Sequence, residues 1–217
     1  MTKQIKTIIF DMDGVLVNSM PYHIKGWKKA LNKFKMFPSK EELYAMEGSS
    51  AEKTITYFSK KYLIKLTKKD KEEIYKLKKK LTKESIKIKI FPWIKKILKH
   101  LKKKKIKLAV VTGANKQFAT DIINKEFKNI FEIIITGEDT KKGKPNPQPY
   151  LLALKKLNIK AKEALVIENA PLGIESSKRS KIKTFAIESS LNKKYLKKAD
   201  KIFINHKKLY EYFKTNN

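Results

Sequence analysis

The sequence predicts an α/β fold, in which a Rossmann-like parallel sheet core carries an inserted α-helical cap domain. Short apolar runs rich in isoleucine and valine recur along the chain with helical segments between them, and one long interval contains helical patterns alone. Strands that alternate with helices are typical of a parallel sheet covered on both faces. The strand-free interval is therefore interpreted as a helical module inserted after the first strand.

Each predicted strand is a short apolar run without the alternation of a half-exposed strand, which indicates burial on both faces. These runs are 7–10, 108–111, 131–135, 164–167 and 184–187, with a weaker one at 201–204. Helical spacing marks 92–101, 149–157 and 171–180, and each begins near a proline, which suits a first helical turn. Further helical stretches cover 22–34, 41–46, 51–62 and 68–81. We expect a core of residues 1–17 plus 90–217 and a cap of residues 18–89.

The composition excludes several classes of protein. Of 217 residues, 41% are hydrophobic, which is enough for a buried core. The chain contains no cysteine, which excludes a disulfide framework and a thiolate zinc site. No apolar run approaches the roughly 20 residues that span a bilayer. The apolar stretch after Lys3 and Lys6 is too short for a signal peptide, so we expect a cytoplasmic protein without a membrane partner.

The net charge of +31 would ordinarily suggest a polyanionic partner. All but one of the 52 basic residues are lysine, however, and the exception is Arg179. Arginine is the residue favoured for bidentate contacts with phosphate and guanine. The lysines are also spread over nearly every polar stretch. We therefore expect a monomer that does not bind nucleic acid, and keep a polyanion-binding protein as the non-enzyme alternative.

Asp11 and Asp13 follow the first predicted strand, at the sheet edge where ligands of open parallel sheets bind. Two residues apart in an extended segment, both side chains can face one pocket. Their mutual repulsion would be relieved by a divalent cation. One carboxylate could then act as a nucleophile and the other as a proton donor. The plainer alternative is a pair of turn-forming aspartates.

Further polar residues follow later strands. Thr112, Gly113 and Ala114 end the second core strand, where a hydroxyl and free N–H groups would cradle an anion, unless Thr112 is only a helix cap. Lys144 lies between a glycine and a proline, in a loop stiff enough to fix an ammonium group beside a phosphoryl group.

The pair Glu168 and Asn169 ends the strand predicted at 164–167. Together with Asp11 and the carbonyl of Asp13, this pair could complete an oxygen shell for Mg²⁺. Which of the two would be the direct ligand stays open, and Asn169 could instead cap the next helix.

In this order, the motifs resemble those of the haloacid dehalogenase superfamily of phosphohydrolases. The resemblance implies that Asp11 attacks phosphorus and forms an aspartyl-phosphate, while Asp13 protonates the leaving group and then activates water. Thr112 and Lys144 would hold the transferring phosphoryl group. Many members have an aspartate where this chain has Asn169, so metal affinity is expected to be lower.

The helical insert resembles the cap of the β-phosphoglucomutase branch, especially over residues 18–27. His23 and Trp27 share one helix face there. We expect a role at the substrate or hinge for His23, with a structural role as the alternative, and we expect Trp27 to pack, with lining of the substrate cleft as its alternative. Mutase members carry a cap arginine shortly after a loop glycine, whereas Gly48 is followed by Ser49.

Glu47 precedes that glycine, a pattern that resembles pyrophosphatase-type members, with Lys78 as a cap counter-charge. The alternative for Glu47 is a solvated cap residue. The function expected is a Mg²⁺-dependent phosphohydrolase acting on a small phosphorylated metabolite or on pyrophosphate. A β-phosphoglucomutase-like phosphotransferase is the enzymatic alternative.

Overall fold

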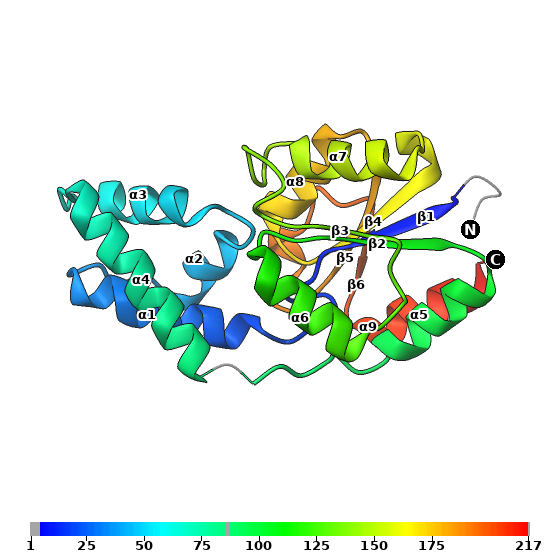
Figure 1. The fold of residues 1–217 in the computed structure, drawn as a ribbon, viewed down its shortest axis with the longest axis horizontal. Helices are drawn as coiled ribbons and strands as arrows, with labels where there is room; N and C mark the ends of the chain where they lie inside the picture. Colours follow the sequence, from blue (N-terminus) through cyan, green and yellow to red (C-terminus); the bar gives the residue numbers. More distant parts are fainter. Residues whose placement is uncertain (1–4, 86, 217) are drawn as a thin grey trace.

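A computed structural model describes residues 5–85 and 87–216; residues 1–4, 86 and 217, which the predicted core and cap ranges include, lie outside the described residues. Six strands form one parallel sheet in the order β3-β2-β1-β4-β5-β6 (Figure 1). The strands are β1 (Thr7–Phe10), β2 (Lys107–Val111), β3 (Ile133–Ile135), β4 (Ala164–Glu168), β5 (Lys183–Ile187) and β6 (Lys201–Phe203). The predicted α/β class is therefore confirmed.

Helices cover both faces of this sheet because side chains alternate between its faces along each strand. Ile8 and Phe10 pack toward α5 (Ile94–Lys103), α6 (Lys116–Glu126) and α9 (His206–Thr215). Ile9 points to the other face, which is covered by α7 (Gln148–Leu157) and α8 (Pro171–Arg179). Figure 1 shows these two helical layers above and below the strands. Both faces are buried, which explains the apolar runs without alternation.

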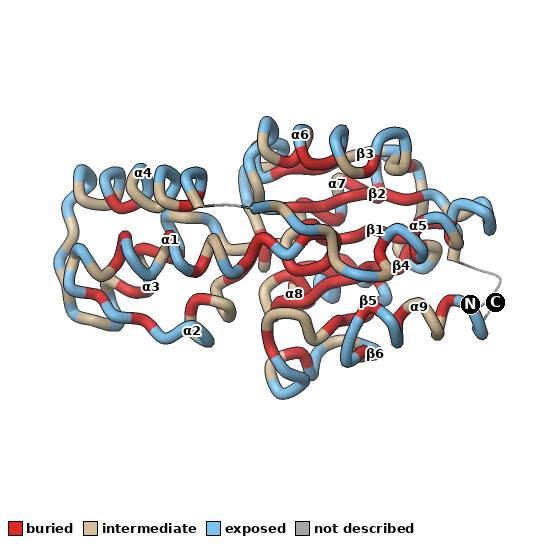
Figure 2. The backbone as a smooth tube through the Cα atoms, turned by 90° about the horizontal axis from the view of Figure 1, so that it is seen from below, coloured by how far each residue is buried: buried red, intermediate tan, exposed pale blue. Residues whose placement is uncertain are grey.

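The interval after β1 folds as four helices with their own hydrophobic core. They are α1 (Met20–Lys33), α2 (Lys40–Ala45), α3 (Ala51–Lys61) and α4 (Lys68–Ser85). Leu31, Phe58 and Ile74 lie at the centre of this core and are fully buried. In Figure 2 this helical unit stands beside the sheet, with its buried positions facing inward.

Two connections join the helical unit to the sheet, and they run side by side. Val17 pairs with Ile90 in an antiparallel bridge. The amide of Asn18 donates to the Lys89 carbonyl at 2.7 Å. The chain thus leaves and re-enters the sheet domain at nearly the same place, next to the carboxyl ends of the strands.

Several predicted boundaries were wrong. The strand predicted from residue 131 begins at Ile133, because Phe131 uses its ring to pack edge-on against Phe10 and Phe127 instead. Helix α4 continues to Ser85, beyond the predicted end at 81. Helices α6 and α9 were not predicted. Among the described residues, no helix combines the length and apolarity that a membrane span requires.

Candidate active site

The carboxyl ends of β1, β2 and β4 meet the helical unit at a cavity of about 580 Å³. The sheet domain supplies Asp11, Asp13 and Thr112 to its wall, and the loop before α7 supplies Lys144. From the other side α1 and α4 supply His23, Trp27 and Lys78, and the α2–α3 loop supplies Glu47. Segments far apart in sequence thus form one polar chamber.

Lys144 and Asp11 form a buried ion pair at the floor of the cavity. The Lys144 Nζ donates to Asp11 Oδ1 at 2.6 Å, to Glu168 Oε1 at 2.6 Å and to the Val111 carbonyl at 3.3 Å. Burial would lower the pKa of Lys144, but the carboxylates of Asp11 and Glu168 raise it well above its ordinary value. Lys144 is therefore a fixed positive charge beside Asp11.

Asp11 lies among more negative charge than one lysine balances. Burial raises the pKa of Asp11 to about 8, the Lys144 ammonium opposes that rise, and the charges of Glu168 and Asp13 add to it. A further cation near Asp11 would favour its ionised form.

Asp13 is held by three groups that favour its charged form. Ser19 donates to Asp13 Oδ1, the Thr112 hydroxyl donates to Oδ2 at 3.4 Å, and His23 Nε2 lies 3.6 Å from Oδ1. Burial would raise the pKa of Asp13, but the neighbouring His23 imidazole, the hydrogen bond from Ser19 and the charge of Lys78 lower it overall. Asp13 is thus a carboxylate whose ionisation is controlled partly from the helical unit.

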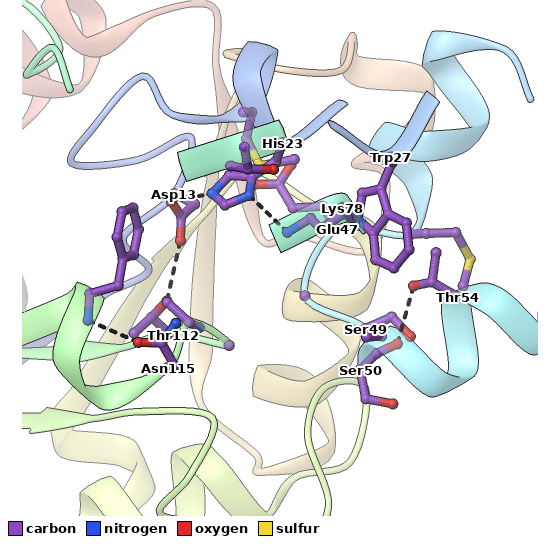
Figure 3. A pocket seen from close by; sticks show the side chains of 18 of the residues that line it. Asp13, His23, Trp27, Glu47, Ser49, Ser50, Thr54, Lys78, Thr112 and Asn115 are labelled. Atoms are coloured by element: carbon purple, nitrogen blue, oxygen red, sulfur yellow. Dashed lines mark hydrogen bonds and ion pairs between the residues drawn. The ribbon is translucent and has the colours of Figure 1, made fainter. Parts of the chain in front are cut away.

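The wall opposite the sheet carries a linked set of side chains, drawn in Figure 3. Lys78 Nζ lies 3.1 Å from His23 Nδ1 and 5.4 Å from the centre of the Trp27 ring. Burial lowers the pKa of Lys78 to about 8, against the opposing charge of Asp13. No carboxylate of the described residues forms an ion pair with Lys78, which leaves its charge available to an anion in the cavity.

Glu47 and Asn169 connect the helical unit to the sheet domain. Asn169 Nδ2 donates to Glu47 Oε1 at 2.9 Å and to Ser190 Oγ at 3.1 Å. Burial raises the pKa of Glu47 well above its ordinary value, and the charge of Asp11 adds to this rise. Gly14, at a φ of 81°, leaves room for the Asn169 side chain, which a Cβ at this position would overlap.

The donor set suits a hard cation such as Mg²⁺, which prefers oxygen ligands. Asn169 Oδ1 is buried and has no hydrogen-bond partner among the described residues, so this amide oxygen is free to accept a further contact. Glu168 has no such spare capacity, because its Oε1 accepts from Lys144 and from Tyr150 at 2.8 Å and its Oε2 accepts from the amide of Asn169 at 3.0 Å. No group of three or more His, Asp or Glu side chains among the described residues is arranged to hold a metal. The set that fits is mixed: a carboxylate, a main-chain carbonyl and an amide oxygen.

The structure brings the predicted site residues to one cavity, with Glu168 beneath it and Asn169 beside it. The prediction that the Ala114 N–H is free to bind an anion was wrong, because this amide already donates to Thr112 Oγ1 at 3.1 Å. The two capping alternatives fail, because Asn115 caps α6 and Ala170 stands at the start of α8. Glu47 is buried rather than solvated.

Sequence reasoning missed three side chains that hold the site in place. Ser19 bonds Asp13, Tyr150 bonds Glu168, and Ser190 bonds Asn169. Serines and a tyrosine outside any motif carry no distinctive signal in a single sequence.

Chemically, the cavity offers an aspartate next to a fixed ammonium, a second aspartate with a neighbouring imidazole, and the Lys78 ammonium on the wall contributed by the helical unit. This arrangement suits attack on an anionic electrophile, with proton transfer to the departing group.

Comparisons with known proteins agree with this chemistry. A family model described as haloacid dehalogenase-like hydrolase matches residues 8–187. The chain is 27% identical to a phosphorylated carbohydrates phosphatase of Thermotoga maritima over 87% of its length and 88% of that protein. It is 30% identical to a provisionally assigned pyrophosphatase, PpaX, of Caldanaerobacter subterraneus, over 87% of this chain and 84% of that protein.

Among solved structures, the chain is similar to a provisionally assigned β-phosphoglucomutase from Bacteroides vulgatus. The two share 34% sequence identity with a TM-score of 0.90, over 98% of this chain and 88% of the other. The similarity thus covers the sheet domain and the helical unit together.

Proposed function

Since the chain belongs to the haloacid dehalogenase-like hydrolase family, whose named relatives here are phosphatases, we propose that it is a Mg²⁺-dependent phosphohydrolase that forms an aspartyl-phosphate on Asp11. It is an enzyme acting on phosphorylated substrates, and we infer that its substrate is small, with inorganic pyrophosphate as the first candidate. The observation that carries this proposal is the buried contact of 2.6 Å between Lys144 and Asp11 at the carboxyl end of β1.

The proposed roles follow from these contacts. Asp11 attacks phosphorus, and the bond from phosphorus to the leaving-group oxygen breaks. Asp13, which is ionised before the reaction, takes up a proton as the anionic substrate binds and donates that proton to the departing oxygen. It later accepts a proton from the water that hydrolyses the aspartyl-phosphate. Lys144 and Thr112 hold the phosphoryl oxygens, for which the Thr112 hydroxyl must exchange its bond with Asp13. Proton transfer at Asp13 is assisted by His23, which lies 3.6 Å away.

Mg²⁺ would be held by Asp11, the main-chain carbonyl of Asp13 and Asn169, and we propose Asn169 rather than Glu168 as the ligand from that pair. The unpartnered Oδ1 of Asn169 and the fully bonded carboxylate of Glu168 support this choice. When bound, the metal would neutralise negative charge on the phosphoryl group.

Pyrophosphate is favoured by the charges around the cavity. Lys78 is a cation that forms no ion pair with a carboxylate of the described residues, and it lines the same cavity as Asp13, the proposed proton donor to the leaving group. A second phosphate could pair with it, with Gly113 and Ala114 lining the same cavity. Glu47 would repel a bare monoester but tolerate a compact polyanion bound to a metal. The similarity to a protein named a pyrophosphatase points the same way.

We further propose that residues 18–89 act as a cap on a core of residues 1–17 and 90–217. The separate hydrophobic core of α1–α4 and the paired connections at Val17 and Ile90 support this division. A cap that closes on the cavity would exclude water and select the substrate.

The direct test is Asp11→Asn, assayed by phosphate release from a panel of phosphate esters and pyrophosphate with Mg²⁺. We expect a loss of more than about 1,000-fold, because the amide cannot act as the nucleophile. Asp200→Asn is the matched control, since Asp200 lies away from the cavity and bonds Lys178 and the Thr184 amide. Unchanged phosphate release in Asp11→Asn would refute the mechanism.

A β-phosphoglucomutase-like phosphotransferase is the second candidate, favoured by the similarity in sequence and structure to the Bacteroides vulgatus protein. The lack of an arginine in the helical unit opposes it, since Arg179, the sole arginine, lies on α8 and pairs with Glu175. Incubation with β-glucose 1-phosphate and a bisphosphate primer separates the two, because only a mutase yields glucose 6-phosphate.

A further inference from the structure

Tyr150 is fully buried on α7, outside the cavity, yet its hydroxyl reaches the catalytic ion pair. It donates to Glu168 Oε1 at 2.8 Å. Its ring packs with Ile9 and Val111 in the apolar layer between the sheet and α7. A phenylalanine would fill the same space, so packing alone does not explain the hydroxyl.

The hydroxyl completes the set of bonds that fixes Glu168. Oε1 of Glu168 accepts from Tyr150 and Lys144, while Oε2 accepts from the amides of Asn169 at 3.0 Å and Ala170 at 3.4 Å. Two of these four donors are main-chain groups on the Oε2 side. On the Oε1 side both donors are side chains, the Tyr150 hydroxyl and the Lys144 ammonium.

Glu168 in turn fixes the direction of Lys144. An ammonium has three protons, and the three acceptors of Lys144 are Asp11, Glu168 and the Val111 carbonyl. When a phosphoryl group enters, one of these protons must turn to it while the others keep the ammonium in place. The Lys144 Nζ also lies 5.2 Å from the centre of the Tyr150 ring, which favours the cation there.

We propose that Tyr150 is a positioning residue that acts through Glu168: its hydroxyl shares the Oε1 atom with Lys144 and so sets where the ammonium lies relative to Asp11. This inference rests on the proposed function of Lys144 in holding the phosphoryl group. Without the hydroxyl, Oε1 would attract Lys144 more strongly and draw it from Asp11. The chain Tyr150–Glu168–Lys144–Asp11 is buried throughout, so water does not replace the missing donor.

The test compares Tyr150→Phe with the control Thr184→Val. Thr184 is also a fully buried hydroxyl residue, but it bonds the Ser177 hydroxyl and the Ile182 carbonyl and none of the four residues in this chain of contacts. We expect Tyr150→Phe to lower kcat about tenfold and to leave KM within about twofold. A tenfold loss of kcat is what we expect if the transition state loses the stabilisation of one hydrogen bond to a charged group. Thr184→Val should lower the melting temperature without this change in kcat.

A second measurement follows the Lys144 ammonium directly, by its ¹H–¹⁵N resonance, assigned by its loss in Lys144→Met. Phenylalanine keeps the ring beside the ammonium, so a shift of the resonance in Tyr150→Phe reports the hydroxyl alone. We expect this shift in the wild-type background and not in Glu168→Gln, where the carboxylate that connects the two groups is gone.

Two outcomes would overturn the proposal. One is a Lys144 resonance that does not move in Tyr150→Phe, or that moves equally in Glu168→Gln. The other is a shifted resonance with kcat within twofold of the wild type. If the wild-type protein released no phosphate from any compound of the panel, the proposed function would fail, while the resonance would still decide whether Tyr150 positions Lys144.

Discussion

Replacing Gly173 with alanine should damage the site more than any ordinary glycine-to-alanine change in a helix. Gly173 lies in the first turns of α8, and a Cβ there would come within 3.0 Å of Oε1, Cδ and Oε2 of Glu168. Real Cβ atoms essentially never show contacts this short, so the carboxylate or the helix must move.

The size of the effect follows from the bonds of Glu168. A shift of the carboxylate breaks its hydrogen bonds to Lys144 and Tyr150, which are 2.6 Å and 2.8 Å long. Each such bond to a charged group contributes about 1.5–3 kcal/mol, and the better helix propensity of alanine returns about 1 kcal/mol. We expect Gly173→Ala to lower the free energy of unfolding by roughly 2–5 kcal/mol.

Urea unfolding followed by tryptophan fluorescence measures this change, and phosphate release measures the accompanying loss of activity. Gly143→Ala is the stability control, because a Cβ at Gly143 meets no atom within 4 Å. It should be neutral or add up to about 1 kcal/mol by restricting the unfolded chain. A Gly173→Ala protein as stable as Gly143→Ala would refute the reasoning.

Three further outcomes are expected. In metal-free protein, Asn169→Asp sets a carboxylate against Glu47 and should lower the melting temperature by roughly 3–10 °C; adding Glu47→Gln, which restores a donor, should recover most of it, and no recovery would contradict the pairing. The Nε2–H of His206 donates to the Val15 carbonyl at 2.8 Å, and burial lowers the pKa of His206 to about 4 from 6.5. Below pH 6.5 the unfolded chain therefore binds a proton that the folded chain does not, so stability should fall by up to about 3 kcal/mol as the pH drops to 4. His206→Gln should lack this part of the acid slope in urea titrations, and equal slopes would exclude it. Finally, kcat/KM for an anionic substrate should decline with ionic strength because of the net charge of +31, and a flat profile would exclude electrostatic attraction.

The fold was largely predictable because a strand buried on both faces requires a short, continuous run of apolar residues. Runs such as 164–167 lack polar alternation, and the run corresponds to β4 next to the centre of the sheet. Helix α6 escaped prediction because its apolar positions are few and its start depends on the side chain of Asn115. The start of β3 was misplaced because tertiary packing of Phe131 overrode its strand propensity.

The residues of the candidate site also fall into some that could be predicted from the sequence and others that could not. Asp11, Asp13 and Lys144 could be singled out because each stands where a predicted strand or stiff loop ends. The partners of these residues could not be found in this way, since Tyr150 and Ser190 belong to no motif. Only the tertiary structure shows that both carboxylate oxygens of Glu168 accept hydrogen bonds while the amide oxygen of Asn169 has no partner among the described residues.

The sequence by itself determined the alternating α/β order, the helical insertion and the polar residues at the strand ends, because periodicity and chain order are local properties. The net charge of +31 says little about the site, where the deciding groups are carboxylates around one buried lysine. Only the tertiary structure decided that Glu47 reaches Asn169 across the two units and that Glu168 is fully bonded. Glu47 and Asn169 are 122 positions apart in the sequence. A hydrogen bond between such distant residues depends on the packing of whole helices and strands rather than on any local sequence pattern.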